Sequence, residues 1–132
     1  MRVLFLGDVV GRSGRKAVLD NLPQLKLNLR PDFIIVNGEN AAGGFGITPT
    51  ICDELFNAGV DAITSGNHAW DQRDIIEYID QEPRLLRPAN YPITAPGNGA
   101  GLFQATNGRL VLVINVMLRL FMDPLDDPFA SV

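Results

Sequence analysis

Carboxylate, carboxamide and imidazole side chains follow three separate apolar segments of this sequence. Asp8 closes the first segment, Glu39 closes the second, and the pair Asn67 and His68 closes the third. A glycine precedes each of these clusters and permits a tight turn of the backbone. Any one of these side chains alone is more often a turn or capping residue than a functional one. Their recurrence after three successive apolar segments favours a shared site.

The chemistry that suits such a site is phosphoryl transfer assisted by metal ions. Oxygen and imidazole ligands suit Mn, Mg, Fe or Zn rather than thiolate-preferring metals. Two ions about 3.5 to 4 Å apart can hold both the attacking and the leaving oxygen of a phosphoryl group. We expect Glu39 to bridge the ions, with Asp8 and the Asn67 carboxamide as terminal ligands on opposite sides. His68 could protonate the leaving oxygen as a general acid.

The elements that must position these groups are predicted to be the strands of a largely parallel sheet. Short apolar runs at residues 2–8, 33–40 and 60–67 read as strands, and the first has the pattern of a strand buried on both faces. Helices are expected between them, which gives a right-handed series of strand and helix and an α/β fold. The carboxyl ends of parallel strands form the ligand crevice of such a sheet. The three polar clusters should therefore meet there.

The first predicted helix starts at Gly14 and should be kinked or split at Pro23. Its apolar positions recur three or four residues apart, at Val18, Leu22, Leu25 and Leu29.

Two further helices carry start and stop signals. In the second, Thr48 is the expected cap, Pro49 takes the first position and Gly59 ends the helix. In the third, Asp71 could cap a helix that Pro83 terminates.

The C-terminal part changes pattern and predicts a β-hairpin. Residues 102–106 and 109–117 are apolar runs joined at Asn107-Gly108, which is a turn signal. The tail from residue 121 has little periodicity and reads as a solvated loop.

Composition favours one globular domain over residues 1–132. The chain has 46% hydrophobic residues and a net charge of -4, so an extended interface with duplex nucleic acid is disfavoured, whereas a small phosphate ester is compatible. The single cysteine, Cys52, is expected to be a buried thiol in a reducing compartment. No export signal and no apolar run of membrane-spanning length is visible, so we expect a cytoplasmic protein without a membrane partner.

Weaker signals remain open to ordinary explanations. The glycines of GDVVGRSGR at residues 7–15 could attract phosphate at a helix start, but they match no nucleotide fingerprint. The loop AAGGFG at residues 41–46 reads as a flexible loop of the site or a loop without function. Trp70 is expected to pack in the fold rather than to stack on a base.

Four segments stand out as motifs: LFLGDVVGRSGR, IIVNGENAAGGFGIT, ITSGNHAWD and INVMLRLFMDPLDDPF. Together they resemble the bacterial YmdB-like metallophosphoesterases, a branch of the calcineurin-like superfamily. The resemblance implies a layered αββα sandwich with a dinuclear Fe or Mn type centre, and phosphodiesterase activity on cyclic nucleotides, including 2',3'-cyclic forms. It implies that Asp8, Glu39, Asn40 and Asn67 are metal ligands and that His68 is the proton donor. Asn40 enters the set only through this resemblance.

The resemblance covers the N-terminal half of that fold, so the sandwich is expected to be incomplete in this chain. Family members continue into motifs whose histidines complete both metal shells, whereas His68 is the only histidine here. Leu118 stands where the family motif leads us to expect a glycine. We therefore expect weak metal binding, impaired turnover, and apolar surface that another copy or a partner covers.

Three functions remain in competition at this point. The first is a metallophosphoesterase with two divalent ions, Fe or Mn before Mg or Zn, and a small phosphodiester substrate. The second is a non-catalytic module that binds a nucleotide or a protein through the same crevice. The third is a metal-free mononucleotide-binding domain, which the absence of a nucleotide fingerprint disfavours.

Overall fold

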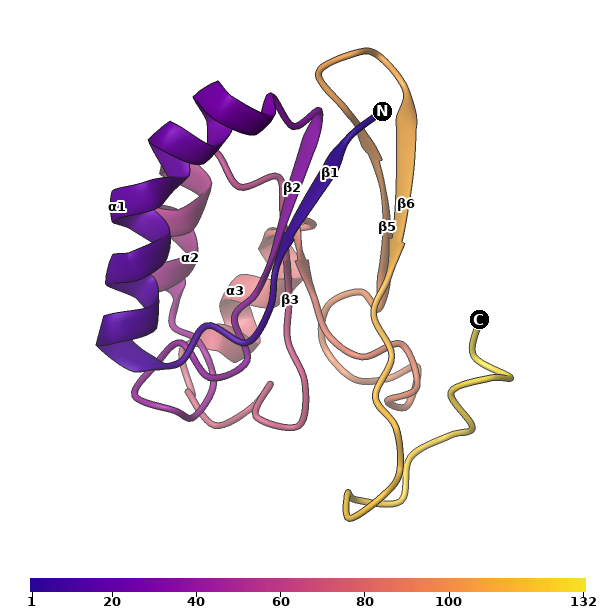
Figure 1. Ribbon diagram of the computed structural model, residues 1–132. Helices are drawn as coiled ribbons and strands as arrows, with labels where there is room; N and C mark the ends of the chain where they lie inside the picture. Colours follow the sequence, from indigo (N-terminus) through magenta and orange to yellow (C-terminus); the bar gives the residue numbers. More distant parts are fainter.

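The computed structural model describes all 132 residues and forms three layers, with helices on one side of a parallel sheet and a hairpin on the other (Figure 1). The elements in chain order are β1 (Val3–Leu6), α1 (Gly11–Leu29), β2 (Phe33–Asn37), α2 (Pro49–Asn57), β3 (Ala62–Thr64), α3 (Ile75–Gln81), β4 (Leu85–Leu86), β5 (Ala100–Gln104) and β6 (Leu110–Ile114). Strands β1 to β4 pair in parallel in sequence order, and β5 pairs antiparallel with β6. The predicted α/β fold with a parallel sheet and a hairpin is confirmed.

The main core lies between the sheet and the helices. It is a cluster of 15 buried residues that includes Leu22 from α1, Val36 from β2 and Leu55 from α2. Cys52 lies in the same cluster and is fully buried, as expected. Burial raises the pKa of the Cys52 thiol, so the thiol stays protonated and serves as packing.

Helix α1 passes through Pro23 without ending, so of the two predicted effects, a kink or a split, the split does not occur. A proline inside a helix costs about 3 kcal/mol through a lost hydrogen bond and a steric clash. Leu22 is fully buried, and Val18 and Leu19 pack against the core. This packing of the apolar face on the sheet holds the part of the helix that leads into the proline.

Helix α2 has the predicted boundaries. Its cap Thr48 accepts a hydrogen bond at Oγ1 from the Ile51 N–H at 3.3 Å, and Pro49 occupies the first turn. Gly59, just after the helix, has φ 93°, a backbone conformation that favours glycine.

Helix α3 begins later than predicted, and its cap is not Asp71. The helix starts at Ile75 after Asp74, whose side chain makes no capping hydrogen bond. The carboxylate of Asp71 accepts its hydrogen bond from a different residue, His68. The fold thus uses the predicted cap Asp71 for a contact with His68 and not at the helix start.

The fourth strand of the sheet was not predicted. Leu85 and Leu86 pair in parallel with Ile63 and Thr64. Two residues are too few to show any apolar alternation in the sequence. These two residues form a strand because they pair with the side of β3 that β2 leaves unpaired.

The hairpin is confirmed and packs on the face of the sheet opposite the helices. Strand β5 pairs with β6 from Ala100↔Ile114 to Gln104↔Leu110, and Gly108 turns the chain with φ 80°. A second core of seven buried residues joins β2, β3 and β4 to the hairpin, with Phe33 and Val113 among its members.

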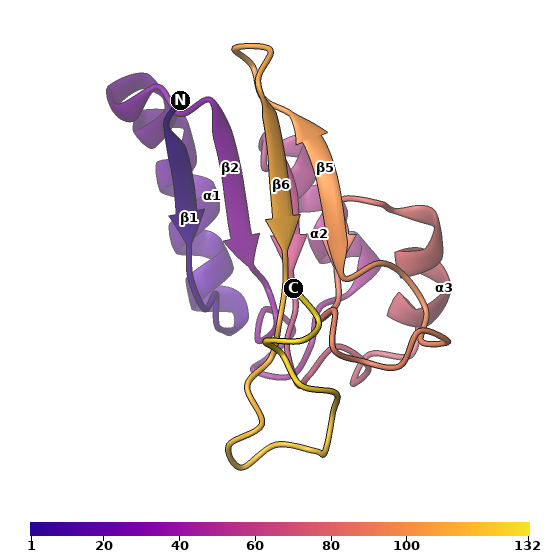
Figure 2. The same cartoon turned by 90° about the vertical axis from the view of Figure 1, so that its right-hand side faces the viewer.

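Strand β1 is more exposed than predicted. Val3 is 42% and Phe5 is 57% exposed, so the prediction of a strand buried on both faces is wrong. Figure 2 shows the reason: the hairpin lies over the part of the sheet away from β1, which forms the uncovered edge. None of the helices is long and apolar enough to cross a membrane.

Candidate functional site

Asp8 lies just after β1 in a turn that is tied to the loop after β2. Its backbone has φ 46°, which is the left-handed region and is uncommon for a residue other than glycine. The Asn40 carboxamide donates from Nδ2 to Asp8 Oδ1 at 2.6 Å. The neighbouring Val9 N–H donates to the Asn37 carbonyl at 3.0 Å. These contacts bring the ends of β1 and β2 together and hold the Asp8 carboxylate there.

Glu39 lies at the centre of the candidate site. A Cβ atom added to Gly66 would overlap the Glu39 carboxylate, so this side chain lies directly against the backbone after β3. Burial raises the pKa of the Glu39 carboxyl, the charge of Asp8 raises it further, and His68 opposes the rise. Two carboxylates that repel one another at a partly buried position are an arrangement that a bound cation would relieve.

His68 is held in the turn between β3 and α3. Its Nδ1 lies 2.6 Å from Asp71 Oδ2. The Phe45 ring meets the imidazole edge to face, with centroids 5.2 Å apart and an interplanar angle of 88°. The loop of residues 41–46 therefore lies beside the histidine, and Gln72 Nε2 fastens it by donating to the Phe45 carbonyl at 2.7 Å.

A cavity of about 380 Å³ opens beside these residues. Its polar lining includes Glu39, Asn67 and Ser65, and its apolar lining comes from the segment after β6, including Met117 and Leu118. Leu118, where the family motif predicts a glycine, is 65% exposed at this rim. The candidate site thus has one polar wall from the sheet and one apolar wall from the C-terminal segment.

Asn115 is a residue of this region that was not singled out from the sequence. It follows β6, and its Nδ2 donates to the Ser65 carbonyl at 2.9 Å and to the Leu86 carbonyl at 3.1 Å. These bonds tie the end of the hairpin to the ends of β3 and β4. The signal was available, because Asn115 is another polar residue directly after an apolar strand.

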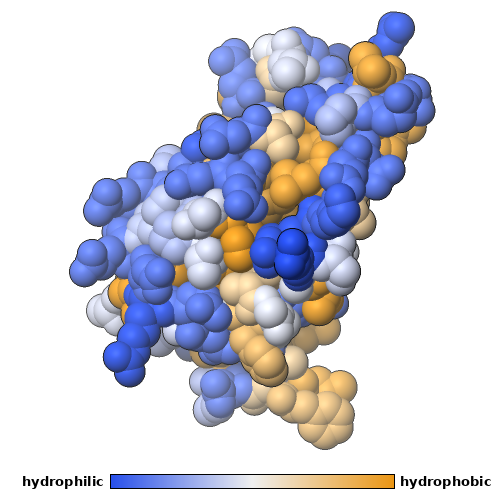
Figure 3. Space-filling model, turned by 90° about the vertical axis from the view of Figure 1, so that its left-hand side faces the viewer, coloured by the Kyte–Doolittle hydropathy of each residue, from blue (hydrophilic) through white to orange (hydrophobic).

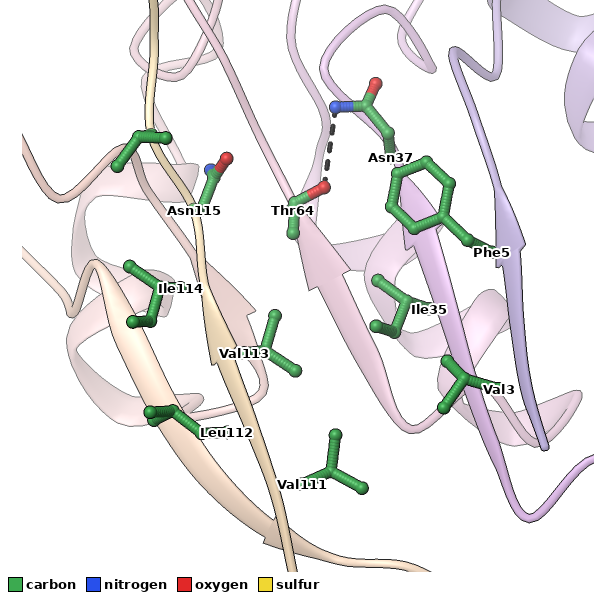
Figure 4. Close-up of a pocket in the computed structure, with 11 residues that line it drawn as sticks. Val3, Phe5, Ile35, Asn37, Thr64, Val111, Leu112, Val113, Ile114 and Asn115 are labelled. Carbon is green, nitrogen blue, oxygen red and sulfur yellow. Dashed lines mark hydrogen bonds between the residues drawn. The ribbon is translucent and has the colours of Figure 1, made fainter. Parts of the chain in front are cut away.

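Asn37 lies between this cavity and an apolar groove of about 530 Å³, and lines both. Its Nδ2 lies 3.4 Å from Thr64 Oγ1, and its Oδ1 is buried without a hydrogen-bond partner. Figure 4 shows Asn37, Thr64 and Asn115 at one end of the groove and the valines of β6 farther along it. Polar atoms gather at the strand ends, and the rest of the groove is apolar.

The five candidate residues thus come from the three loops that follow the carboxyl ends of β1, β2 and β3. Asp8 contacts Asn40, Glu39 interacts with Asp8 and His68, and Asn67 lines the cavity with Glu39. Trp70 packs against the Tyr91 ring with centroids 5.6 Å apart, which agrees with a packing role. The glycine loop of residues 41–46 lies next to His68 through Phe45.

The donor atoms of these residues are of the type that a divalent cation binds. Their number is smaller than a complete metal site has. Two carboxylates and two carboxamides offer the oxygen ligands that Mn, Mg and Fe accept. No three histidine, cysteine, aspartate or glutamate side chains are grouped as a metal site would require. A metal held here would depend on the amide oxygens of Asn40 and Asn67 besides the carboxylates.

An α/β fold with a parallel sheet, a hairpin and a polar cluster at the strand ends defines the class of this chain. Its family is shown by comparison: residues 4–132 match the family described as YmdB-like protein, and the chain belongs to this family.

Known proteins agree with this assignment. The chain is 51% identical over 129 residues to the 2',3'-cyclic-nucleotide 2'-phosphodiesterase of Bacillus subtilis (strain 168), covering 98% of this chain and 48% of that protein. A crystal structure of a hypothetical protein from Thermus thermophilus matches with a TM-score of 0.91 and 44% identity, over 99% of this chain and 50% of the other. The structure of a novel phosphatase from Mycoplasma pneumoniae matches with a TM-score of 0.84 and 32% identity, over 97% and 47%. The chain thus spans about half the length of these relatives.

Proposed function

We propose that this chain carries part of a metal-dependent phosphodiesterase that acts on cyclic nucleotides of the 2',3' type, with two divalent ions, Fe or Mn. The relative at 51% identity is named for this activity. The observation that carries the proposal within the fold is the meeting of the three loops that follow β1, β2 and β3. Asn40 donates a hydrogen bond to Asp8, and Glu39 lies against Gly66 and lines one cavity with Asn67.

The residues of the proposed site would have two roles, metal binding and proton donation. The oxygens of Asp8, Glu39, Asn40 and Asn67 would hold the ions, and we propose that both ions share Glu39. When bound, the ions would supply a nucleophile and neutralise charge on the phosphoryl oxygens. His68 would donate a proton to the leaving oxygen. We expect this chemistry in the cytoplasm on a small substrate.

A direct test is the hydrolysis of bis-p-nitrophenyl phosphate and of 2',3'-cAMP by this chain with added manganese. We expect slow, manganese-dependent hydrolysis that Glu39→Gln and His68→Ala each remove. Asp74→Asn is the matched control, because Asp74 makes no capping bond at the start of α3. Activity that all three variants retain would show contamination and contradict the proposal.

The second candidate is a non-catalytic module that binds a nucleotide through the same crevice. It is favoured by the absence of any group of three metal-binding histidine, cysteine or acidic side chains. Binding of 2',3'-cAMP by calorimetry without any hydrolysis over a long incubation would select this candidate over the phosphodiesterase.

A further inference from the structure

The pair of His68 and Asp71 has a role that the phosphodiesterase proposal does not assign. Asp71 lies three residues after His68 in a turn outside helix α3, and the helix begins only at Ile75. Its Oδ2 lies 2.6 Å from His68 Nδ1, and this is the hydrogen bond that its side chain makes in the fold. Since Asp71 does not cap the helix, its carboxylate is available to accept a hydrogen bond from the imidazole.

The chemistry of this contact decides where the imidazole proton sits. An ionised carboxylate can only accept a hydrogen bond, so Nδ1 must be the donor. The neutral ring therefore carries its proton on Nδ1, which leaves Nε2 without one. The ring makes no hydrogen bond to the protein at Nε2, and the side chain is 27% exposed. Nε2 is thus the nitrogen that remains for a substrate.

A second contact fixes the plane of the ring. Phe45 meets the imidazole edge to face, and Gln72, next to Asp71, holds the Phe45 carbonyl at 2.7 Å. Gly46 fits closely against the same turn, because a Cβ added there would lie 2.8 Å from the His68 carbonyl oxygen. The histidine is therefore held at Nδ1 by the carboxylate and beside its ring by Phe45 of the loop.

We propose that Asp71 is a positioning residue for His68: its carboxylate accepts the hydrogen bond from Nδ1–H and turns Nε2 toward the substrate. The neutral ring then holds its one proton on Nδ1, and a second proton, bound at Nε2, is the one that the ring can donate to the leaving oxygen. The catalytic consequence rests on the proposed function, whereas the state of the imidazole does not. The same partnership of a histidine with a carboxylate or carbonyl at its other nitrogen orients catalytic and metal-binding imidazoles in general.

The test is a long-range proton–nitrogen NMR spectrum of the uniformly ¹⁵N-labelled chain. His68 is the only histidine in the sequence, so the spectrum contains one imidazole and needs no assignment by mutation. For the neutral ring we expect the pattern of protonation at Nδ1. Asp71→Ala should change it to the pattern of a ring protonated at Nε2, and Asp71→Glu should restore the first pattern at least in part.

Asp74→Asn is the control, because it removes a neighbouring carboxylate that the imidazole does not contact. It should leave the spectrum unchanged, and circular dichroism should show that all variants are folded. A native ring protonated at Nε2, or an Asp71→Ala variant that stays protonated at Nδ1, would overturn the proposal.

An activity measurement separates this proposal from the proposed function. If the chain hydrolyses a phosphodiester, Asp71→Ala should lower kcat roughly 10- to 100-fold, as the loss of an orienting partner does, with little change in KM. Complete inactivity of the native chain would count against the phosphodiesterase and leave the NMR result to decide the role of Asp71. An unchanged kcat in an active Asp71→Ala variant would contradict the positioning role.

Discussion

Glu39 and Gly66 depend on each other, since the carboxylate occupies the space where any other residue at position 66 would place a Cβ atom. This is a close approach between the loops after β2 and β3. The candidate site therefore needs a particular side chain on one loop and the absence of one on the other.

Gly66→Ala should displace Glu39 and so abolish manganese-dependent hydrolysis, which means a fall in rate of more than about tenfold. Gly108→Ala is the control, because Gly108 has φ 80° but open space around it, at the distant hairpin turn. Both changes should lower stability in urea, and only the first should abolish hydrolysis. Equal activity of the two variants would show that Glu39 does not need its present position.

The affinity of the chain for metal ions depends on the same site residues. Calorimetric titration with manganese should show weak binding, since Asp8 and Glu39 are the only carboxylates of the proposed ligand set and the others are neutral amides. Asp8→Asn should weaken it further, and Asp74→Asn should not. Tight binding of two ions per chain would contradict the expectation that this ligand set is incomplete.

At the scale of elements, the connection from α3 to β4 is held by an ion pair. Arg84 Nε donates to Glu82 Oε1 at 2.8 Å, and the guanidinium also lies over the Phe56 ring, 3.8 Å from its centroid. The hydrogen bond from Arg84 lowers the pKa of the Glu82 carboxyl. A short strand such as β4, with two residues, depends on such a connection more than a long one does.

Glu82→Gln should lower the free energy of unfolding at pH 7 by about 1 kcal/mol, a modest amount because Arg84 is partly exposed. A carboxylate whose pKa is lowered on folding stabilises the protein above its ordinary pKa, and this contribution disappears as the pH falls through the lowered value. The difference between the two proteins should therefore be largest at pH 7 and disappear at an acidic pH below the lowered pKa of Glu82. Urea unfolding at both pH values measures it.

Glu54→Gln, an exposed change in α2, serves as the control for this experiment. It should have little effect at either pH. A Glu82→Gln effect of equal size at pH 7 and at low pH would show that the ion pair is not its cause.

At the scale of the molecule, the hairpin exposes apolar side chains on its outer face. Leu102, Leu110 and Leu112 are each more than 60% exposed, and β6 pairs with β5 on one side only. In the space-filling view of another face, a band of hydrophobic residues runs between two hydrophilic regions (Figure 3). An open strand edge beside apolar surface favours association.

We predict that this chain associates with itself as its concentration rises, measured as an increase in mass by light scattering. Leu112→Lys should reduce the association by placing a charge on the outer face of β6. Ile93→Lys is the matched control, because Ile93 is 94% exposed in a loop outside the hairpin. A native chain that stays monomeric at all concentrations would contradict the prediction.

The accuracy of the sequence-based predictions follows the range of the interactions involved. The cap Thr48, the end of α2 at Gly59 and the hairpin turn were predictable, since each depends on neighbouring residues. The continuous helix through Pro23 and the exposure of Phe5 were not, because both depend on what packs against the element. The site residues share this division: the sequence indicated which polar groups follow the strands, and the fold decided which of them touch.

The order of the first three strands and of the helices between them, the hairpin and the polar residues at the strand ends could be read from the sequence, because periodicity and turn chemistry act over a few residues. Three contacts of the site follow from the tertiary fold alone. Glu39 lies against Gly66, and Asn40 donates a hydrogen bond to Asp8. Asp71 contacts His68 and does not cap a helix. Local rules alone would let Asp71 cap the helix. Its turn instead packs against the loop that carries Phe45, a contact between segments about two dozen residues apart, and the Asp71 carboxylate lies beside His68.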